Sequence, residues 1–209
     1  MNTDTLALAA HGPVIPVIVI NRLEDAVPMA EALVAGGVKV LEITLRTPIA
    51  LACMKAIVRA VPEAIVGAGT IRSIADAQAA KDAGCVFGVS PGYTSAIGLA
   101  CRNLGLPLLP GISSASDVMR ASGDGYQFLK FFPATAAGGI PMLKALAGPF
   151  ADIAFCPTGG ITVETAPQFL ALPNVKVCGG SWLTPSDAVD AKDWARITKL
   201  AAAAKALRS

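Results

Sequence analysis

Lys130 is the residue whose surroundings most clearly suggest chemistry. It lies in the apolar run 126–132, where two-residue alternation places Phe128, Lys130 and Phe132 on one face of a strand. Burial disfavours the charged form of a lysine, and a neutral amine in an apolar pocket can attack a carbonyl carbon. The plainer interpretation is a lysine that only pairs with a buried carboxylate. Lys39 and Lys176 lie near the starts of their runs and fit that plainer interpretation.

Glu42 is the second unusual residue, because it is the one carboxylate inside the apolar run 38–45. Thr44 and Arg46 share its face by the same alternation. A buried carboxylate is costly unless it is paired or hydrogen-bonded. The sequence leaves two interpretations open: a structural ion pair of Glu42 with Lys130 or Arg46, or a general acid/base beside a reactive lysine, with Arg46 binding a substrate carboxylate.

Two glycine pairs suggest an anion site. They occur in CPTGG, which holds Thr158, Gly159 and Gly160, and in CGGSW, which holds Ser181. Paired glycines let backbone N–H groups approach an anion closely, and the two hydroxyls add further donors. Barrel proteins often bind phosphate at the loops after their seventh and eighth strands, where these motifs fall. The alternative is that both are ordinary tight turns.

The elements that must position these residues alternate regularly along the chain. Eight short apolar runs predict strands at 14–20, 38–45, 64–68, 85–89, 107–109, 126–132, 152–156 and 175–178. Segments of helical composition lie at 25–35, 49–61, 74–83, 95–104, 115–121, 141–147, 162–170 and 186–205. This order predicts one α/β domain over residues 1–209, a (β/α)8 TIM barrel with a short N-terminal helix. A doubly wound open sheet is the alternative, but no G-x-G-x-x-G follows the first strand.

Composition excludes several classes of protein. Charged residues make up 15% of the chain, against roughly 25% in an average soluble domain. The longest uncharged stretch, 83–101, is interrupted by glycine and proline, which argues against a membrane span. The net charge is only +2, and the basic residues are scattered along the chain. No nucleic-acid partner is therefore expected. The N-terminus lacks the pattern of a signal peptide, and five cysteines without a C-x-x-C pair suit a reducing cytoplasm.

Other conspicuous residues receive structural interpretations. His11 is the single histidine, so a zinc site built on several histidines is impossible within one chain. We expect His11 to be a capping or surface residue. Cys156 and Cys178 have no histidine nearby in sequence and are expected to be small core residues. Trp194 belongs to an apolar pattern of helical spacing and is expected to pack.

Taken together, these residues resemble the 2-keto-3-deoxy-6-phosphogluconate aldolase family, whose members often also act on 4-hydroxy-2-oxoglutarate. The likeness runs from about residue 15 to residue 207. Its strongest stretches are GVKVLEITLRT, VPEAIVGAGT, SPG, LPGISS, LKFFPA, FCPTGGI and GGSWL. The family is a short (β/α)8 barrel that assembles as a homotrimer and needs no metal and no cofactor.

The resemblance also implies roles for individual residues. Lys130 is expected to form the Schiff base, Glu42 to act as general acid/base and Arg46 to bind the substrate carboxylate. The remaining residues implied to bind substrate are Thr70 and Pro91 on the pyruvate side, Phe132 near the imine, and Thr158, Gly159, Gly160 and Ser181 at the phosphate.

The expected reaction is therefore cleavage of a phosphorylated 2-keto-3-deoxy sugar acid to pyruvate and an aldehyde phosphate. Three alternatives stay open at this point. The sugar acid can be 2-keto-3-deoxy-6-phosphogalactonate, which differs from the phosphogluconate compound at one hydroxyl. The protein can also be a phosphosugar isomerase or epimerase that forms no covalent adduct, or a module that only binds a phosphometabolite. The last two leave the aromatic-flanked lysine beside a lone carboxylate unexplained.

Overall fold

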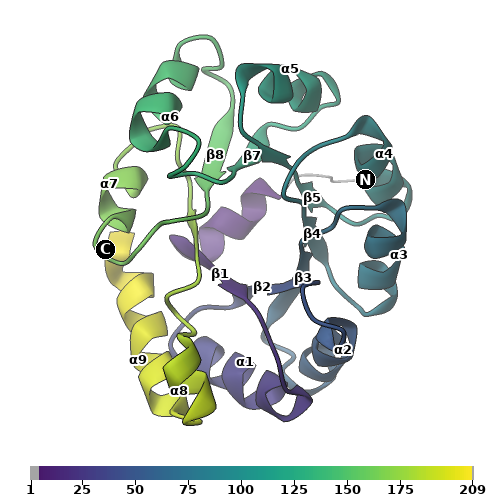
Figure 1. The fold of residues 1–209 in the computed structure, drawn as a ribbon, viewed down its shortest axis with the longest axis vertical. Coiled ribbons are helices and arrows are strands. Elements are labelled where there is room, and N and C mark those ends of the chain that lie inside the picture. The colour runs from purple at the N-terminus through teal and green to yellow at the C-terminus, as the bar shows by residue number, and fades with distance from the viewer. Residues whose placement is uncertain (1–4, 209) are drawn as a thin grey trace.

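The computed structural model describes residues 5–208, in which parallel strands alternate with helices (Figure 1). The strands are β1 (Val14–Ile18), β2 (Val40–Thr44), β3 (Ile65–Gly69), β4 (Phe87–Val89), β5 (Leu108–Leu109), β6 (Gly111–Ile112), β7 (Phe128–Phe131), β8 (Ala154–Pro157) and β9 (Cys178–Gly180). The α-helices are α1 (Ala26–Ala35), α2 (Ala50–Ala60), α3 (Ile74–Asp82), α4 (Ser95–Asn103), α5 (Ala115–Gly123), α6 (Gly139–Ala147), α7 (Ala166–Leu170), α8 (Ser186–Asp190) and α9 (Trp194–Lys205). Three 3-10 helices are η1 (Leu6–His11), η2 (Leu23–Asp25) and η3 (Ala206–Arg208).

The strands pair in parallel in the order β5-β4-β3-β2-β1-β9, with a second sheet β6-β7-β8. Together they give an α/β fold whose parallel sheet curves as a half-barrel, with the α-helices outside it (Figure 1). The two sheets adjoin at Pro110, which separates β5 from β6. Because proline has no N–H, it interrupts the ladder, but its carbonyl still accepts from the Lys130 N–H at 2.8 Å. Isolated parallel bridges join Phe155 to Val175 and Thr158 to Gly179.

Most predicted elements are found, and the differences have local causes. The expected last helix, 186–205, is two helices because Lys192 has a left-handed φ of 53° and Asp193 starts α9 by accepting from the Arg196 N–H. The expected last strand, 175–178, forms only a bridge at Val175, and the regular strand begins at Cys178. The short N-terminal helix is present as η1.

Side-chain caps begin several of the outer helices. The hydroxyls of Ser73, Thr94 and Ser114 each accept from a backbone N–H in the first turn of α3, α4 and α5. Asp117 completes a capping box with Ser114. The helices therefore start at positions defined by local chemistry, directly after the strand ends that carry the functional residues.

The inner face of the curved sheet holds its own apolar cluster. Its buried members come from most of the strands: Ile15, Val40, Phe87, Val89, Leu109, Phe128, Ala154, Cys156 and Val177. A larger cluster fills the layer between strands and helices. The two clusters follow from strand alternation, because consecutive side chains point to opposite faces.

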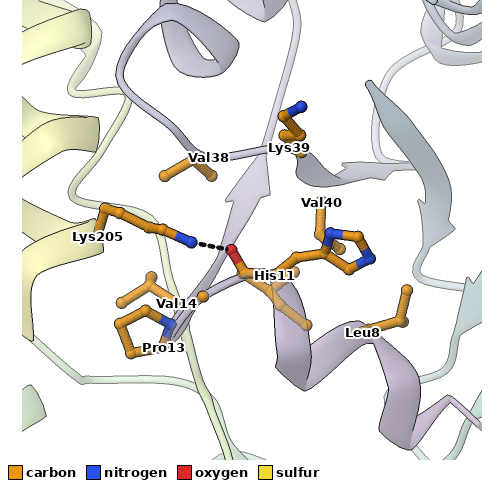
Figure 2. Close-up of a pocket in the computed structure, with 10 residues that line it drawn as sticks. Leu8, His11, Pro13, Val14, Val38, Lys39, Val40 and Lys205 are labelled. Atoms are coloured by element: carbon orange, nitrogen blue, oxygen red, sulfur yellow. Dashed lines mark hydrogen bonds between the residues drawn. The ribbon is translucent and has the colours of Figure 1, made fainter. Parts of the chain in front are cut away.

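The 3-10 helix η1 covers the amino-terminal side of this inner cluster. Leu8 and Ala9 pack against it. The chain is fastened there by Lys205 of α9, whose ammonium donates to the carbonyl of His11 (Figure 2). His11 itself is exposed, as expected, and the hollow at this end is small, about 260 Å³. Within residues 5–208 no helix is both long and apolar enough to cross a membrane.

Phe87 offers a test of the inner cluster. Its ring occupies the space left by Gly67 on the neighbouring strand, where an added Cβ would overlap the ring. We predict that Phe87→Ala lowers the free energy of unfolding by about 3–5 kcal/mol. Val86→Ala is the matched control, because the Val86 side chain is 55% exposed, and should change it by less than about 0.5 kcal/mol. Urea unfolding measures both, and equal effects would show that Phe87 is not part of a packed core.

Candidate active site

Lys130 and Glu42 form a buried ion pair. Lys130 Nζ lies 3.1 Å from Glu42 Oε1, and the two side chains are 4% and 3% exposed. Lys130 comes from β7 and Glu42 from β2, so the pair joins two strands that are not neighbours in either sheet. Of the two ion pairs that the sequence allowed for Glu42, the one with Lys130 forms. It provides an immediate proton acceptor for the lysine ammonium.

The surroundings of the pair are apolar and contain a thiol. Lys130 Nζ lies 5.4 Å from the centroid of the Phe132 ring, within range of a cation–π contact. Cys156 is the partner of Lys130 on β8. Burial raises the pKa of the Cys156 thiol to about 12, and the nearby Lys130 lowers it by less. Cys156 is therefore protonated at neutral pH, which fits the expected core residue rather than a nucleophile.

Space for the Glu42 carboxylate comes from a glycine on the next strand. A Cβ added at Gly69 of β3 would overlap Glu42 Oε1 and Cγ. Gly69 was not among the predicted site residues. The available signal was the run Gly67–Ala68–Gly69, whose small residues face a strand with a buried glutamate. Gly69 fixes where the carboxylate can lie relative to Lys130.

Arg46 and Thr70 meet at the carboxyl ends of β2 and β3. Arg46 Nε donates to Thr70 Oγ1 at 3.2 Å. Thr70 has a φ of 63°, a left-handed backbone that a β-branched residue rarely adopts and that costs on the order of 1–3 kcal/mol. Such strain persists where the surrounding structure requires it and is frequent at functional sites. Arg46 is exposed and keeps N–H groups that can bind a carboxylate in two-pronged fashion.

A hollow of about 480 Å³ opens at this end of the strands. It brings together six of the ten predicted site residues: Arg46, Phe132, Thr158, Gly159, Gly160 and Ser181. Val17, Val19, Ile161, Gly179 and Gly180 complete the lining. Val17 and Val19 were not predicted, although alternation along β1 places them on one face and Val17 is the partner of Glu42. We name this space the main hollow.

The two glycine motifs adopt backbone conformations that suit an anion. Gly159 and Gly160 have φ values of 101° and 74°, which other residues rarely adopt. A side chain at Gly160 would also lie 2.6 Å from Thr135 Oγ1. Gly179 leaves room for the Thr158 hydroxyl in the same way. The ends of β8 and β9 therefore bring these glycines together with Thr158 and Ser181 in the lining of the main hollow.

Lys130, Glu42 and Thr70 do not line the main hollow, and neither does Pro91. Its backbone packs against Gly111, where an added Cβ would overlap the Pro91 carbonyl. Gly111 is in turn the partner of Lys130 in the second sheet. The structure thus places Pro91 one strand away from Lys130.

The chain matches the model of a known protein family and several of its relatives. The model of the KDPG and KHG aldolase family, named for 2-keto-3-deoxy-6-phosphogluconate and 4-hydroxy-2-oxoglutarate, matches residues 7–200. A 2-dehydro-3-deoxy-phosphogluconate aldolase of Pseudoalteromonas atlantica is 53% identical over 192 residues, 92% of this chain and 89% of the relative. A KHG/KDPG aldolase of Escherichia coli is 50% identical over 199 residues, 95% of this chain and 93% of the relative.

A solved structure agrees with these relatives. The KDPG aldolase of Legionella pneumophila, with pyruvate captured as a covalent carbinolamine intermediate, superposes with a TM-score of 0.94 at 47% identity. The match covers 96% of this chain and 98% of that one. Sequence and fold agree over nearly the whole length, and the chain belongs to the KDPG and KHG aldolase family.

Proposed function

We propose that this chain is a class I aldolase that cleaves 2-keto-3-deoxy-6-phosphogluconate to pyruvate and glyceraldehyde 3-phosphate through a Schiff base on Lys130. By the same route it would cleave 4-hydroxy-2-oxoglutarate to pyruvate and glyoxylate. The observation that carries the proposal is the buried Lys130–Glu42 pair, with 3.1 Å between Nζ and Oε1, beside the ring of Phe132. A neutral amine forms when Glu42 takes a proton from the Lys130 ammonium.

The first half of the reaction joins the substrate to the lysine. The Lys130 amine attacks the C2 carbonyl carbon, and Glu42 returns a proton to the resulting oxygen. The carbinolamine then loses water, and a protonated imine remains. This iminium withdraws electrons from the C3–C4 bond, and it forms in an apolar site where the Glu42 carboxylate stabilises its positive charge.

The second half breaks the carbon–carbon bond. Glu42, acting through a water molecule, takes the proton of the C4 hydroxyl as the C3–C4 electron pair moves toward the iminium nitrogen. Glyceraldehyde 3-phosphate leaves, and an enamine stays on Lys130. Protonation at C3 and hydrolysis of the imine then release pyruvate and restore the free lysine.

The other site residues would hold the substrate in the position that this reaction requires. Arg46, tied to Thr70, binds the carboxylate next to the reacting C2, and Pro91 supports the pyruvate side from the strand beside Lys130. Phe132 packs on the imine. The phosphate would bind the donors at the ends of β8 and β9: Thr158, Gly159, Gly160 and Ser181. Binding energy from this remote phosphate positions the reacting bond.

We further infer that both sheets belong to one closed (β/α)8 barrel, a single domain over residues 1–209. One support is Pro110, where the chain passes directly from the first sheet to the second. Another is the pair of bridges Phe155–Val175 and Thr158–Gly179, which link β8 to the β9 segment. The five cysteines are all buried, which is consistent with the reducing compartment expected from the sequence and supports the cytoplasm. No metal or cofactor takes part in this proposed mechanism.

The phosphogalactonate compound and an isomerase reaction are the competing proposals. The relatives at 53% and 51% identity are named phosphogluconate aldolases, whereas a KDPGal structure is 29% identical to this chain. An isomerase would form no bond to Lys130. The phosphogluconate assignment is therefore preferred, and trapping at Lys130 separates it from the isomerase.

The covalent step predicts a specific adduct. Borohydride reduction with pyruvate should add one pyruvate-derived group to Lys130, as read by intact-mass and peptide mass spectrometry. Lys130→Ala should lose both adduct and turnover. Glu42→Gln should lower kcat by about 10²–10⁴-fold while substrate still binds. Lys39→Ala is the control, because Lys39 is exposed at the start of β2. An active Lys130→Ala variant would refute the mechanism.

Gly69→Ala tests the position of the Glu42 carboxylate. The added methyl group displaces the carboxylate from Lys130, and a shift of about 1 Å can cost on the order of 100-fold in rate. We predict that kcat falls about 100-fold with little change in KM. Gly92→Ala, where an added Cβ meets nothing within 4 Å, should keep full activity. Equal activity of the two variants would show that Glu42 needs no such placement.

We also propose a homotrimer, supported by apolar side chains on the outer helices. Ile74 and Leu99 are 55% and 54% exposed and border a shallow apolar hollow between α3 and α4. Analytical ultracentrifugation should give three times the mass of one chain. Leu99→Glu should shift it toward monomer, whereas Ala203→Glu on exposed α9 should not. An unchanged trimer in Leu99→Glu would place the interface elsewhere.

A further inference from the structure

A second hollow of about 610 Å³ lies beside the main hollow. Ser181, Val17 and Val19 line both, so the two spaces share a wall at the ends of β1 and β9. The second hollow continues past Ser181 toward η2 and α8. Apart from Ser181, none of its polar residues has a role in the reaction proposed above. We name it the distal hollow.

Asp25 is the residue that points to a ligand there. It lines the distal hollow and is 2% exposed. Arg22 Nε donates to Asp25 Oδ2 at 2.6 Å, but Oδ1 has no hydrogen-bond partner within residues 5–208. A buried carboxylate oxygen without a partner is costly, and most such oxygens in proteins are satisfied. The free acceptor therefore calls for a donor from a molecule in the distal hollow.

The charges around Asp25 restrict what that donor can be. Arg22 is shared between Asp25 and Asp190, to which Arg22 Nη1 approaches within 3.2 Å. One cation and two carboxylates give the distal hollow a net negative charge, which disfavours a second phosphate. The guanidinium beside Asp25 also disfavours a cationic ligand. Thr184 and Ser186 add hydroxyls that donate and accept. The combination suits an uncharged group that carries hydroxyls.

We propose that the distal hollow binds the far hydroxyl groups of an uncharged polyhydroxy aldehyde, with Asp25 Oδ1 accepting a hydrogen bond from one of them. The inference rests on the proposed function, because the aldehyde is the partner of pyruvate in the reverse reaction. In that direction C3 of the Lys130-bound enamine forms a bond to the aldehyde carbon. The aldehyde oxygen takes its proton from Glu42, and hydrolysis of the imine releases the product.

Asp25→Asn tests the acceptor without changing the shape of the side chain. Because Arg22 Nε needs an acceptor, the amide oxygen takes the place of Oδ2, and the amide NH₂ takes the place of Oδ1. An acceptor is thereby exchanged for a donor. With pyruvate as donor, kcat/KM for erythrose should fall about tenfold, the worth of one hydrogen bond to a charged acceptor. Butanal, which lacks the hydroxyls, and glyceraldehyde 3-phosphate should change less than about twofold.

A second variant fills the distal hollow and leaves the Arg22–Asp25 pair in place. Val189 lines it from α8, so Val189→Phe should also lower kcat/KM for erythrose selectively. Val86→Phe, at an exposed position before β4, is the control. This variant decides the matter if Asp25→Asn fails to fold. Equal losses for erythrose and butanal, or no loss in either variant, would overturn the subsite.

The wild-type protein separates this inference from the proposed function. If erythrose is not accepted while borohydride still traps pyruvate on Lys130, the distal subsite is wrong and the aldolase mechanism stands. If no adduct forms and glyceraldehyde 3-phosphate is not accepted either, the proposed function itself fails, and the inference fails with it.

Discussion

The buried pair of Lys130 and Glu42 is the interaction on which the rest of the site depends. Removing two charges from water costs several kcal/mol for each ion, and their attraction offsets this only when the geometry is good. The separation of 3.1 Å requires β2 and β7 to face each other across the inner side of the sheet. A curved parallel sheet provides this arrangement, because strands far apart in sequence can then direct side chains toward a common centre.

Small residues make that centre accessible. Gly69 leaves the volume that the Glu42 carboxylate occupies, and Gly179 does the same for the Thr158 hydroxyl. Deeper in the sheet, Gly67 admits the ring of Phe87, which closes the inner cluster below the site. Large side chains thus fill the amino-terminal half of the inner face, and glycines keep the carboxyl end open. The polar pair does not itself line the main hollow, but it lies beside Val17 and Phe132, which do.

Much of this arrangement was predictable from sequence, because the alternation of side chains within a strand and the order of strands and helices along the chain can be read directly from it. As predicted, Lys130 lies in the last part of a strand, β7, and Glu42 lies inside a strand, β2. The two glycine pairs also lie at strand ends, one just after β8 and the other at the end of β9. Other features depend on contacts that a single sequence does not reveal. Pro110 directly follows the predicted strand 107–109 and separates β5 from β6, which was not predicted. Lys192 breaks a predicted helix through its backbone conformation. Val17 was missed because an inward valine resembles any core residue until its partner is known to be Glu42.

The two adjoining hollows show why charge balance, rather than shape alone, distinguishes their ligands. Around the main hollow the neutral backbone donors of Gly159 and Gly160 favour an anion. Past Ser181, two carboxylates already engage Arg22 and offset its positive charge, and Asp25 Oδ1 has no hydrogen-bond partner among residues 5–208. An extended substrate that passed from one hollow to the other would meet donors first and acceptors afterwards. A phosphate suits the first environment and a hydroxyl suits the second, so a substrate's reach past Ser181 depends on whether its end is charged.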